Sequence, residues 1–268
     1  GRLKGEVCLI GDGSGGGYAI PSLDLGCKGG LGVRLIARGH TAHGSTPFLG
    51  ENALRKLIDV IPVVERIAEF ELDVPAELAQ VVRDSIAHFK ASQALTPAQE
   101  QAADRLYAYP TVTCNILNAG VKINVVPDYA EAQFDVRLTP GTDPLKVKAQ
   151  LEALVSDAGV PGVEVAVRVP PVVGYYESPS APAARSLAET LRRMTGKEPL
   201  AKILTGGTDG IAVHHSAGIP SVGWGTSLTG MAHQPDERIS IENLVLGVKV
   251  YAAFPYVYAS LGDSPQRT

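Results

Sequence analysis

Asp12 and His233 are the residues whose types and positions most favour binding a metal ion. Asp12 lies in the glycine-rich stretch 11–17, directly after an apolar run at 6–10 that predicts a short buried strand. Ligands collect outside the carboxyl ends of strands in open α/β sheets, so a carboxylate there is well placed to bind a cation. His233 follows a predicted strand and loop at the same end of the predicted sheet, and an oxygen–nitrogen ligand set suits Zn²⁺. The alternatives are a tight turn at Asp12 and a structural role for His233.

His43 is a second candidate for chemistry. It lies in residues 39–53, three positions after His40, in a loop between a predicted strand and a predicted helix. Two histidines at this spacing could ligate a metal. The alternative is that the loop caps the helix and that His43 is a neutral hydrogen-bonding residue.

Two further segments place polar residues where they could bind a substrate. Asn124 lies in a predicted turn between two antiparallel strands and Arg137 lies in the second of these strands, a pattern that by itself indicates only the turn. Gly206, Thr208 and Asp209 lie where a predicted strand meets the N-terminus of a helix. Such a terminus is a natural anion site, although an N-cap explains these residue types equally well.

The glycines at 13–17 raise the possibility of a phosphate-cradling loop. The sequence contains no GxxxxGK[ST] motif, and a glycine-rich stretch alone is weak evidence for phosphate binding. We therefore regard a phosphate-binding α/β protein as the less favoured interpretation.

The central part of the chain predicts one inserted domain. Its expected order is strand, helix, helical insert, strand, strand, helix and strand, at residues 32–38, 52–67, 75–108, 111–117, 130–138, 143–155 and 163–169. This order matches an α+β unit of the βαββαβ, ferredoxin-like kind, with an antiparallel sheet and helices on one face. We place this domain at residues 29–172.

The remaining segments predict a different architecture. Helices are expected at 182–194, 208–216 and 240–261, and strands at 200–204 and 220–225. Strands that alternate with helices favour a parallel α/β sheet, to which residues 6–11 would add a strand. The expected fold class is therefore α/β, with a partial parallel-sheet domain (residues 1–28 and 173–268) interrupted by the α+β insert.

Composition excludes several function classes. The 268 residues carry a net charge of -4, and their Lys and Arg are scattered, so we expect neither nucleic acid nor an anionic membrane surface as a partner. No apolar run approaches the ~18 residues that span a bilayer. The three cysteines show no CxxC spacing and are expected to be buried thiols. These features favour a soluble, cytoplasmic protein.

Four strings, taken in their order along the chain, resemble one known family. They are His43-Gly-Ser-Thr-Pro-Phe-Leu-Gly-Glu-Asn-Ala, Asn124-Val-Val-Pro-Asp with the later Phe134-Asp-Val-Arg137, Gly206-Gly-Thr-Asp209, and Ala232-His233-Gln-Pro-Asp-Glu-Arg-Ile. The resemblance is to the co-catalytic zinc metallopeptidases and amidohydrolases, which include aminoacylase, succinyl-diaminopimelate desuccinylase, acetylornithine deacetylase, carnosinase-type dipeptidases and glutamate carboxypeptidase. It covers essentially the whole chain, and the family carries an inserted βαββαβ domain as a lid and dimerisation module.

The resemblance implies a role for each candidate residue. Asp12 and His233 match ligands of the two zinc ions, which cobalt or manganese could replace, and His43 matches the lid histidine that polarises the scissile carbonyl. Substrate binding is implied for the residues that match the remaining motifs, namely Asn124, Arg137, Gly206, Thr208 and Asp209. The implied partners are an N-acyl amino acid or peptide substrate and a second copy of the chain bound through the lid.

The sequence also departs from that family. Its members carry, upstream of the position of Asp12, a His-x-Asp motif, a bridging Asp and a Glu-Glu pair, and this chain contains neither His-x-Asp nor Glu-Glu. We therefore expect the chain to represent the C-terminal two-thirds of such an enzyme and to be inactive alone. The expected function of the full-length protein is metal-dependent hydrolysis of an amide or peptide bond. The alternative is a non-catalytic fragment or dimerisation module derived from such an enzyme.

Overall fold

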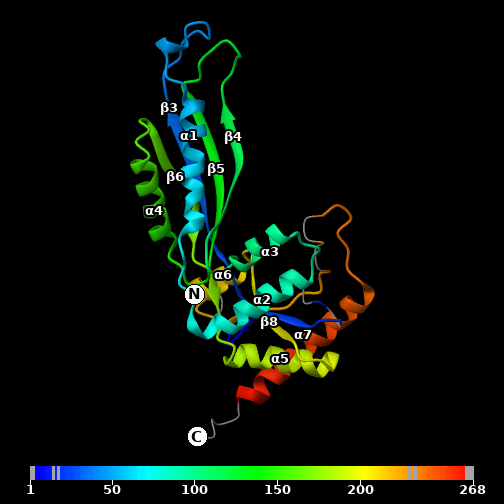
Figure 1. The fold of residues 1–268 in the computed structure, drawn as a ribbon. Helices are drawn as coiled ribbons and strands as arrows, with labels where there is room; N and C mark the ends of the chain where they lie inside the picture. The colour runs from blue at the N-terminus through cyan, green and yellow to red at the C-terminus, as the bar shows by residue number, and fades with distance from the viewer. Residues whose placement is uncertain (1–3, 14–15, 17–18, 229–230, 232–233, 263–268) are drawn as a thin grey trace. The chain divides into compact units, whose positions relative to one another are not determined.

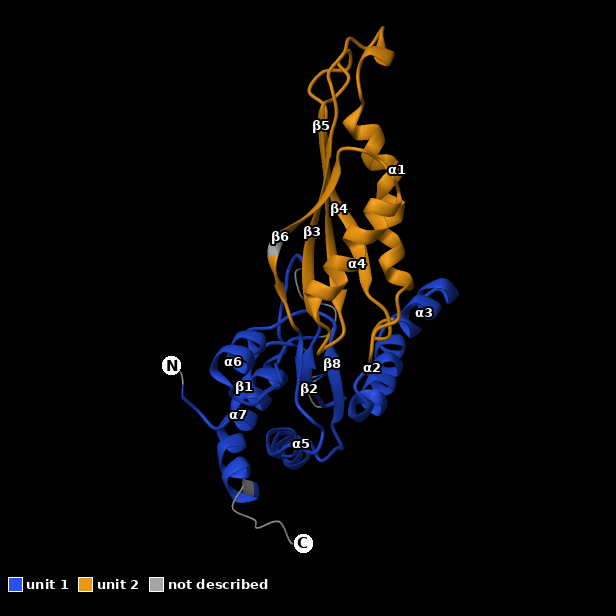
Figure 2. Ribbon diagram, turned by 90° about the vertical axis from the view of Figure 1, so that its left-hand side faces the viewer, with its two compact units in different colours: residues 1–28, 74–105, 174–268 blue, residues 29–73, 106–173 orange. Residues whose placement is uncertain are grey.

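The computed structural model describes residues 4–13, 16, 19–228, 231 and 234–262 (Figure 1). The chain forms two compact units, coloured separately in Figure 2. Unit 1 comprises Gly1–Lys28, Val74–Arg105 and Gly174–Thr268, and unit 2 comprises Gly29–Asp73 and Leu106–Val173.

Unit 2 is built on one four-stranded antiparallel sheet. Its strands are β3 (Gly29–Arg38), β4 (Thr111–Ala119), β5 (Tyr129–Leu138) and β6 (Val163–Val172), in the order β4-β5-β3-β6. The helices are α1 (Ala53–Glu65) and α4 (Pro144–Asp157), with short 3₁₀ turns at Pro47–Leu49 and Arg66–Glu69. Both helices pack on the sheet, as the βαββαβ order predicts.

The core of unit 2 follows from the two periodicities in its sequence. Alternate residues of β3, such as Leu31 and Leu35, are fully buried and pack with residues of α1 spaced three or four apart, such as Leu57 and Val60. The side chain of Asn52 caps α1 by accepting a hydrogen bond from the backbone N–H of residue 55 at 3.1 Å. This packing fixes the sheet and, with it, the loops at the two ends of its strands.

Unit 1 contains a five-stranded sheet of shorter strands and most of the helices. Its strands are β1 (Cys8–Ile10), β2 (Ser22–Cys27), β7 (Tyr175–Tyr176), β8 (Leu200–Leu204) and β9 (Ser221–Gly223). Its helices are α2 (Ala79–Ala91), α3 (Pro97–Asp104), α5 (Pro182–Thr195), α6 (Gly210–Ala217) and α7 (Ile241–Gly262), with a 3₁₀ turn at Ala76–Leu78. The strand order is β1-β9-β2-β7, and β8 also pairs with β2.

The mixed α/β fold class is confirmed, but the strands of unit 1 are not all parallel. β1 is parallel to β9 and β2 is parallel to β8, whereas β2 is antiparallel to both β9 and β7. The expectation of a parallel sheet assumed a helical crossover between successive strands. The link from β1 to β2 contains no helix in the part that the structure describes, and a short link returns the chain in the opposite direction.

The helical segment Val74–Arg105 belongs to unit 1, although the predicted insert, residues 29–172, included it. Its helix α2 packs on β8, and the hydroxyl of Ser85 accepts a hydrogen bond from the backbone N–H of Ile203 at 3.2 Å. Helical periodicity identified these helices correctly, but it carries no information about which sheet they cover.

The last helix, α7, has a buried side and an apolar exposed side. Leu246, Val250 and Phe254 are buried, and the helix packs against α5. The exposed side carries large apolar residues, among them Ile241 at 81% and Val248 at 67% exposed. By length and composition alone α7 resembles a membrane-spanning helix, but the core helices of globular domains often meet the same criterion.

Candidate active site

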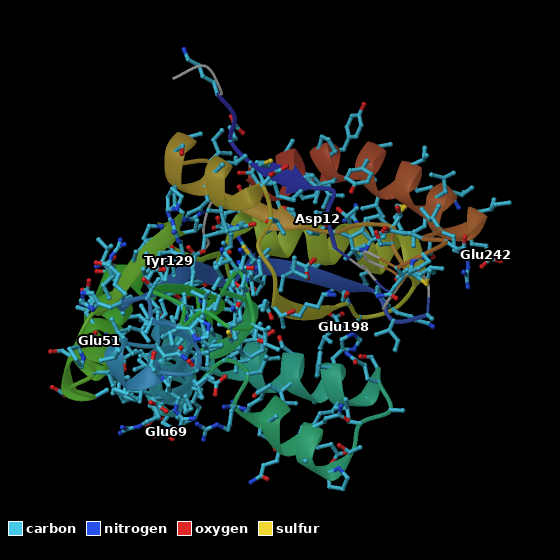
Figure 3. The ribbon with its side chains drawn as sticks, turned by 90° about the horizontal axis from the view of Figure 1, so that it is seen from above. Asp12, Glu51, Glu69, Tyr129, Glu198 and Glu242 are labelled. Atoms are coloured by element: carbon cyan, nitrogen blue, oxygen red, sulfur yellow. The ribbon has the colours of Figure 1, made fainter. Side chains whose placement is uncertain are left out.

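Asp12 lies in the loop that follows β1 and is exposed (Figure 3). Its Oδ1 accepts a hydrogen bond from the backbone N–H of Gly13 at 2.7 Å. Gly13 has a φ of +94°, a conformation that residues with a Cβ rarely adopt, so a glycine is needed for this turn. The loop hydrogen bond therefore involves Oδ1 of an exposed carboxylate.

The strand end before Asp12 lies beside the strand end that leads towards His233. β1 and β9 are parallel with Ile10 opposite Gly223, and the backbone N–H of Trp224 donates to the carbonyl of Ile10 at 3.0 Å. His233 itself lies outside the described residues, so its predicted approach to Asp12 stays a prediction. A metal site here therefore has one predicted ligand in the part of the chain that the structure describes.

Asp24, which no sequence motif marked, lies directly beneath this loop. Its side chain is buried in the middle of β2, 2% exposed, and a Cβ placed on Gly13 would lie 2.7 Å from its Oδ2. Burial raises the pKa of the Asp24 carboxyl to about 7, because the ionised form loses its hydration. The ammonium of Lys202, 3.6 Å from Oδ1, offsets this only in part, and the charge of Asp12 raises the pKa slightly further.

The segment with Gly206, Thr208 and Asp209 connects β8 to α6. The Thr208 hydroxyl accepts a hydrogen bond from the backbone N–H of Gly210 at 3.2 Å, so it partly caps α6, whereas Asp209 makes no side-chain cap. A free helix N-terminus can accept an anion such as a substrate carboxylate. The Asp12 loop approaches this segment, since a Cβ on Gly13 would lie 3.6 Å from Cδ1 of Leu204, the last residue of β8.

Tyr175 packs against the start of α6, and no sequence motif indicated this role. It is 3% exposed, and a Cβ on Gly210 would lie 2.2 Å from its hydroxyl oxygen. Burial raises the pKa of Tyr175, so the phenol stays protonated at ordinary pH. Its ring stacks on His214, whose Nδ1 lies 3.1 Å from a carboxylate oxygen of Glu177. No short motif contains these residues, because they come from different strands and helices.

In unit 2, His43 and Asn124 lie close together. The backbone N–H of Gly44 donates to the carbonyl of Asn124 at 2.8 Å, and His43 forms an isolated antiparallel bridge with Val125. Both side chains are exposed. The loop after β3 and the loop before β5, which carry an exposed imidazole and an exposed amide, are thus joined through their backbones. A pocket of about 250 Å³ lies next to them, lined by residues that include Val125 and Tyr129.

Arg137 does not lie with His43 and Asn124. It lies near the opposite end of β5, paired with Gly30 of β3, and its guanidinium binds Asp135 with an N–O distance of 2.9 Å. A strand rises about 3.3 Å per residue, so the eight steps from Tyr129 to Arg137 correspond to roughly 26 Å. Asn124 and Arg137, which are both predicted to bind substrate, therefore lie near different ends of β5.

The described residues alone do not complete a metal site. Among them, no group of three or more His, Cys, Asp or Glu side chains is arranged to hold a metal ion. Zinc in proteins takes three or four protein ligands, and Asp12 is the single predicted one among the described residues.

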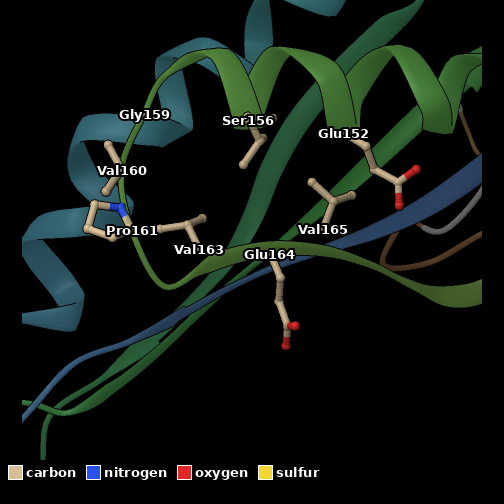
Figure 4. A pocket seen from close by; sticks show the side chains of 9 residues that line it. Glu152, Ser156, Gly159, Val160, Pro161, Val163, Glu164 and Val165 are labelled. Atoms are coloured by element: carbon tan, nitrogen blue, oxygen red, sulfur yellow. The ribbon is translucent and has the colours of Figure 1, made fainter.

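A separate pocket of about 390 Å³ lies between the C-terminal part of α4 and β6 (Figure 4). Glu152 and Glu164 are its acidic residues, and each has a basic partner, Lys148 and Arg38 respectively. None of the predicted site residues lines this pocket. We therefore do not assign it a role in the candidate active site.

Comparison with known proteins identifies the family. Residues 25–163, just over half of the chain, match the peptidase dimerisation domain of the M20 family. The chain therefore belongs to the M20 peptidase family, and the predicted resemblance is confirmed. The matched range includes His43, Asn124 and Arg137.

Individual relatives cover different parts of the chain. It is 24% identical over 247 residues to a succinyl-diaminopimelate desuccinylase of Corynebacterium glutamicum, a match that covers 90% of this chain and 54% of that protein. It is 32% identical over 124 residues to an Aspergillus clavatus protein named "Probable carboxypeptidase", covering 45% of this chain and 23% of that protein. The chain thus spans about half the length of the first relative and less of the second.

Solved structures share the fold. An M20 family metallo-carboxypeptidase from Sulfolobus solfataricus superposes with a TM-score of 0.76 at 23% identity, over 96% of this chain and 64% of that one. The di-peptidase Dug1p from Saccharomyces cerevisiae gives 0.75 at 17% identity, over 97% and 60%. At these identities the comparison establishes the fold of the chain and not its substrate.

Proposed function

We propose that this chain is part of a metal-dependent hydrolase that cleaves the amide or peptide bond of an N-acyl amino acid or a small peptide. The observation that carries the proposal is the pairing of His43 with Asn124 at one end of the unit 2 sheet, in a chain of the M20 peptidase family. An exposed imidazole beside an exposed amide provides hydrogen-bond donors that can bind the oxygen of a scissile carbonyl.

The proposal gives each candidate residue the role that its family motif implies. Asp12 and His233 would each hold one of two zinc ions, for which cobalt or manganese could substitute, and metal bound there would supply activation of a water molecule. His43 stabilises the tetrahedral oxyanion, a contribution on the order of 3 kcal/mol per donor. The substrate is bound by the polar residues already described, Asn124, Arg137, Gly206, Thr208 and Asp209. Because Arg137 lies at the far end of β5, a small substrate would meet it together with His43 and Asn124 only if these residues came from two different copies of the chain.

The remaining ligands and the general base are proposed to come from polypeptide outside these 268 residues. The relatives are longer than this chain, and its sequence has neither the His-x-Asp nor the Glu-Glu motif of such enzymes. The apolar exposed side of α7, with Ile241 and Val248, is a surface of the kind that further protein covers. The chain by itself is expected to be inactive.

We further propose that two copies associate through unit 2. β4 is an edge strand of the sheet, and its exposed residues include Ile116 and Leu117 at 41% and 48%. Exposed edge strands are templates for pairing with another chain, and the matched family domain is described as a dimerisation domain. Size measurement of the purified chain by light scattering tests this association directly.

The function is tested by comparing the full-length gene product with this chain. Both would be purified, their zinc, cobalt and manganese contents measured, and hydrolysis assayed on a panel of N-acyl amino acids and dipeptides. We expect two metal ions and turnover in the full-length protein, and neither in the chain alone. A full-length product without metal or turnover would instead support a non-catalytic dimerisation module.

His43 provides the sharper test within the full-length protein. His43→Ala should lower kcat by roughly 10²–10³ with unchanged metal content, because one oxyanion donor is lost. His40→Ala, three residues away in the same exposed loop, is the matched control and should leave kcat nearly unchanged. Equal kcat in wild type and His43→Ala would remove His43 from the mechanism.

A further inference from the structure

The imidazole of His43 has a well-defined partner on one of its two nitrogens. Nδ1 lies 3.2 Å from the backbone nitrogen of Ser45, whose N–H donates to it, and 2.7 Å from the hydroxyl oxygen of Ser45. A backbone N–H can only donate, so Nδ1 must act as an acceptor in this arrangement. In the neutral ring the proton then resides on Nε2.

The backbone around this contact is anchored on both sides. The carbonyl of His43 accepts a hydrogen bond from the N–H of Thr46 at 2.9 Å, and the N–H of Gly44 donates to the carbonyl of Asn124. The bridge between His43 and Val125 adds a further connection to the loop before β5. The Cβ of His43 is therefore held in place, and the side-chain torsions are the freedom that the contact with Ser45 removes.

We propose that Ser45 is a positioning residue that holds His43 in the Nε2–H tautomer, with that N–H directed away from the loop as a donor. The inference rests on the proposed function, since it names the group that would present the His43 proton to a substrate oxygen. Ser45 acts through His43 and does not itself contact the substrate.

The tautomer matters because only a protonated nitrogen can donate to a carbonyl oxygen or an oxyanion. If the proton moved to Nδ1, Nε2 would present a lone pair to the same oxygen and repel it. For metal-ligating histidines, removing a partner that fixes the tautomer and the ring orientation typically changes metal affinity or activity 10–100-fold. The Ser45 hydroxyl makes the shorter of the two contacts with Nδ1, so its loss should loosen the ring and leave only the longer contact with the backbone N–H.

The same loop contains an internal control, His40. Its Nδ1 faces a carboxylate oxygen of Glu51 at 3.7 Å, beyond hydrogen-bond distance, and its partner is thus Glu51 rather than Ser45. Replacing Ser45 should leave the nitrogens of His40 unchanged.

The test measures the ring-nitrogen shifts of this chain labelled with ¹⁵N-histidine, at a pH about two units above the ordinary histidine pKa of about 6.5. The signals of His43 are assigned by their disappearance in His43→Gln. We expect a pyridine-like Nδ1 and a pyrrole-like Nε2 in the wild type. In Ser45→Ala the two shifts should move towards each other, and Ser45→Thr, which keeps the hydroxyl, should restore them.

Kinetics on the full-length protein separates this inference from the proposed function. Ser45→Ala should lower kcat about tenfold or more, with Ser45→Thr recovering most of it. A protonated Nδ1 in the wild type, or unchanged His43 shifts in Ser45→Ala, overturns the positioning role whatever the kinetics show. If the shifts behave as expected but His43→Ala retains full kcat, the contact stands and the catalytic role of His43 fails. If His43→Ala loses kcat but Ser45→Ala does not, the catalytic role stands and the positioning role fails.

Discussion

Replacing Asp24 by Asn should remove a pH dependence from the stability of unit 1. The Asp24 carboxyl is buried, and its oxygens accept no hydrogen bond from the described residues. The Lys202 ammonium lies 3.6 Å from Oδ1, longer than the 2.7–2.9 Å of a charge-assisted hydrogen bond, so it acts as an ion pair only. Asn has nearly the same shape as Asp and stays neutral at every pH.

The size of the effect follows from the shift of the Asp24 pKa from 3.8 to about 7. Below pH 3.8 the folded and unfolded chains both hold this proton, and the stability contributed by the neutral acid is fully present. Between 3.8 and about 7 only the folded chain holds it, so stability falls as pH rises, and it levels off above 7. At 1.36 kcal/mol per pKa unit the total loss is about 4 kcal/mol.

The assay is urea unfolding of wild type and Asp24→Asn at pH 5 and pH 8. At pH 5 the folded wild type still holds the Asp24 proton, but the unfolded chain has mostly lost it, so about 1.6 kcal/mol of the total is already lost and the variant should be more stable by about that amount. At pH 8 the variant should be more stable by up to about 4 kcal/mol, since it has no carboxylate to ionise. Glu237→Gln, at an exposed acid of the same unit, is the control and should follow the wild type at both values. Parallel pH profiles for wild type and Asp24→Asn would show that this carboxyl is ionised in the folded chain at pH 5, contrary to the reasoning.

Three further substitutions test packing and hydrogen bonding by urea unfolding. Leu57→Ala removes a fully buried side chain from the unit 2 core and should lower the free energy of unfolding by about 2–5 kcal/mol. A decrease below about 1 kcal/mol would contradict the assigned core. Glu131→Ala removes an acceptor that serves a guanidinium, a phenol and an amide, and should cost about 1–3 kcal/mol, whereas Glu131→Gln should cost less. Gly210→Ala forces a Cβ against the Tyr175 hydroxyl and should cost about 1–3 kcal/mol, more than Gly207→Ala, whose Cβ would have only a 3.5 Å contact.

The fold of unit 2 was predictable because each of its elements carries its own period. β3 and β6 alternate apolar and other residues, and α1 repeats apolar residues at helical spacing, so sequence order alone indicated βαββαβ. In unit 1 the strand β2 was missed, because its polar residues Ser22 and Asp24 are as buried as its leucines. Strand direction was missed as well, since it depends on the path of the link between β1 and β2 and not on any local pattern.

The predicted site residues show the same division. The motifs that contain His43 and Asn124 identified two residues that lie together across two loops. The motif that ends at Arg137 identified a residue of β5, but the length of that strand separates Arg137 from His43 and Asn124. The sequence motifs therefore indicated which elements carry the polar residues. The length of β5 determines which of these residues lie close together in the folded chain.

The residues that position the candidate groups carry no motif, and the reason is physical. Ser45 acts on His43 through a contact between residues two positions apart in the chain. The effect of this contact depends on which ring nitrogen of His43 faces Ser45. Asp24 lies so close beneath the Asp12 loop that only a residue without a Cβ fits at position 13, since a Cβ there would lie 2.7 Å from Oδ2 of Asp24. A residue that contacts a ligand must be of a particular type, so it belongs to a recognisable motif. A residue that supports it must only complement one neighbouring group in the folded chain, and several residue types can do that. Substitutions at Ser45 and Asp24 therefore test the structure itself, independently of the family to which the sequence belongs.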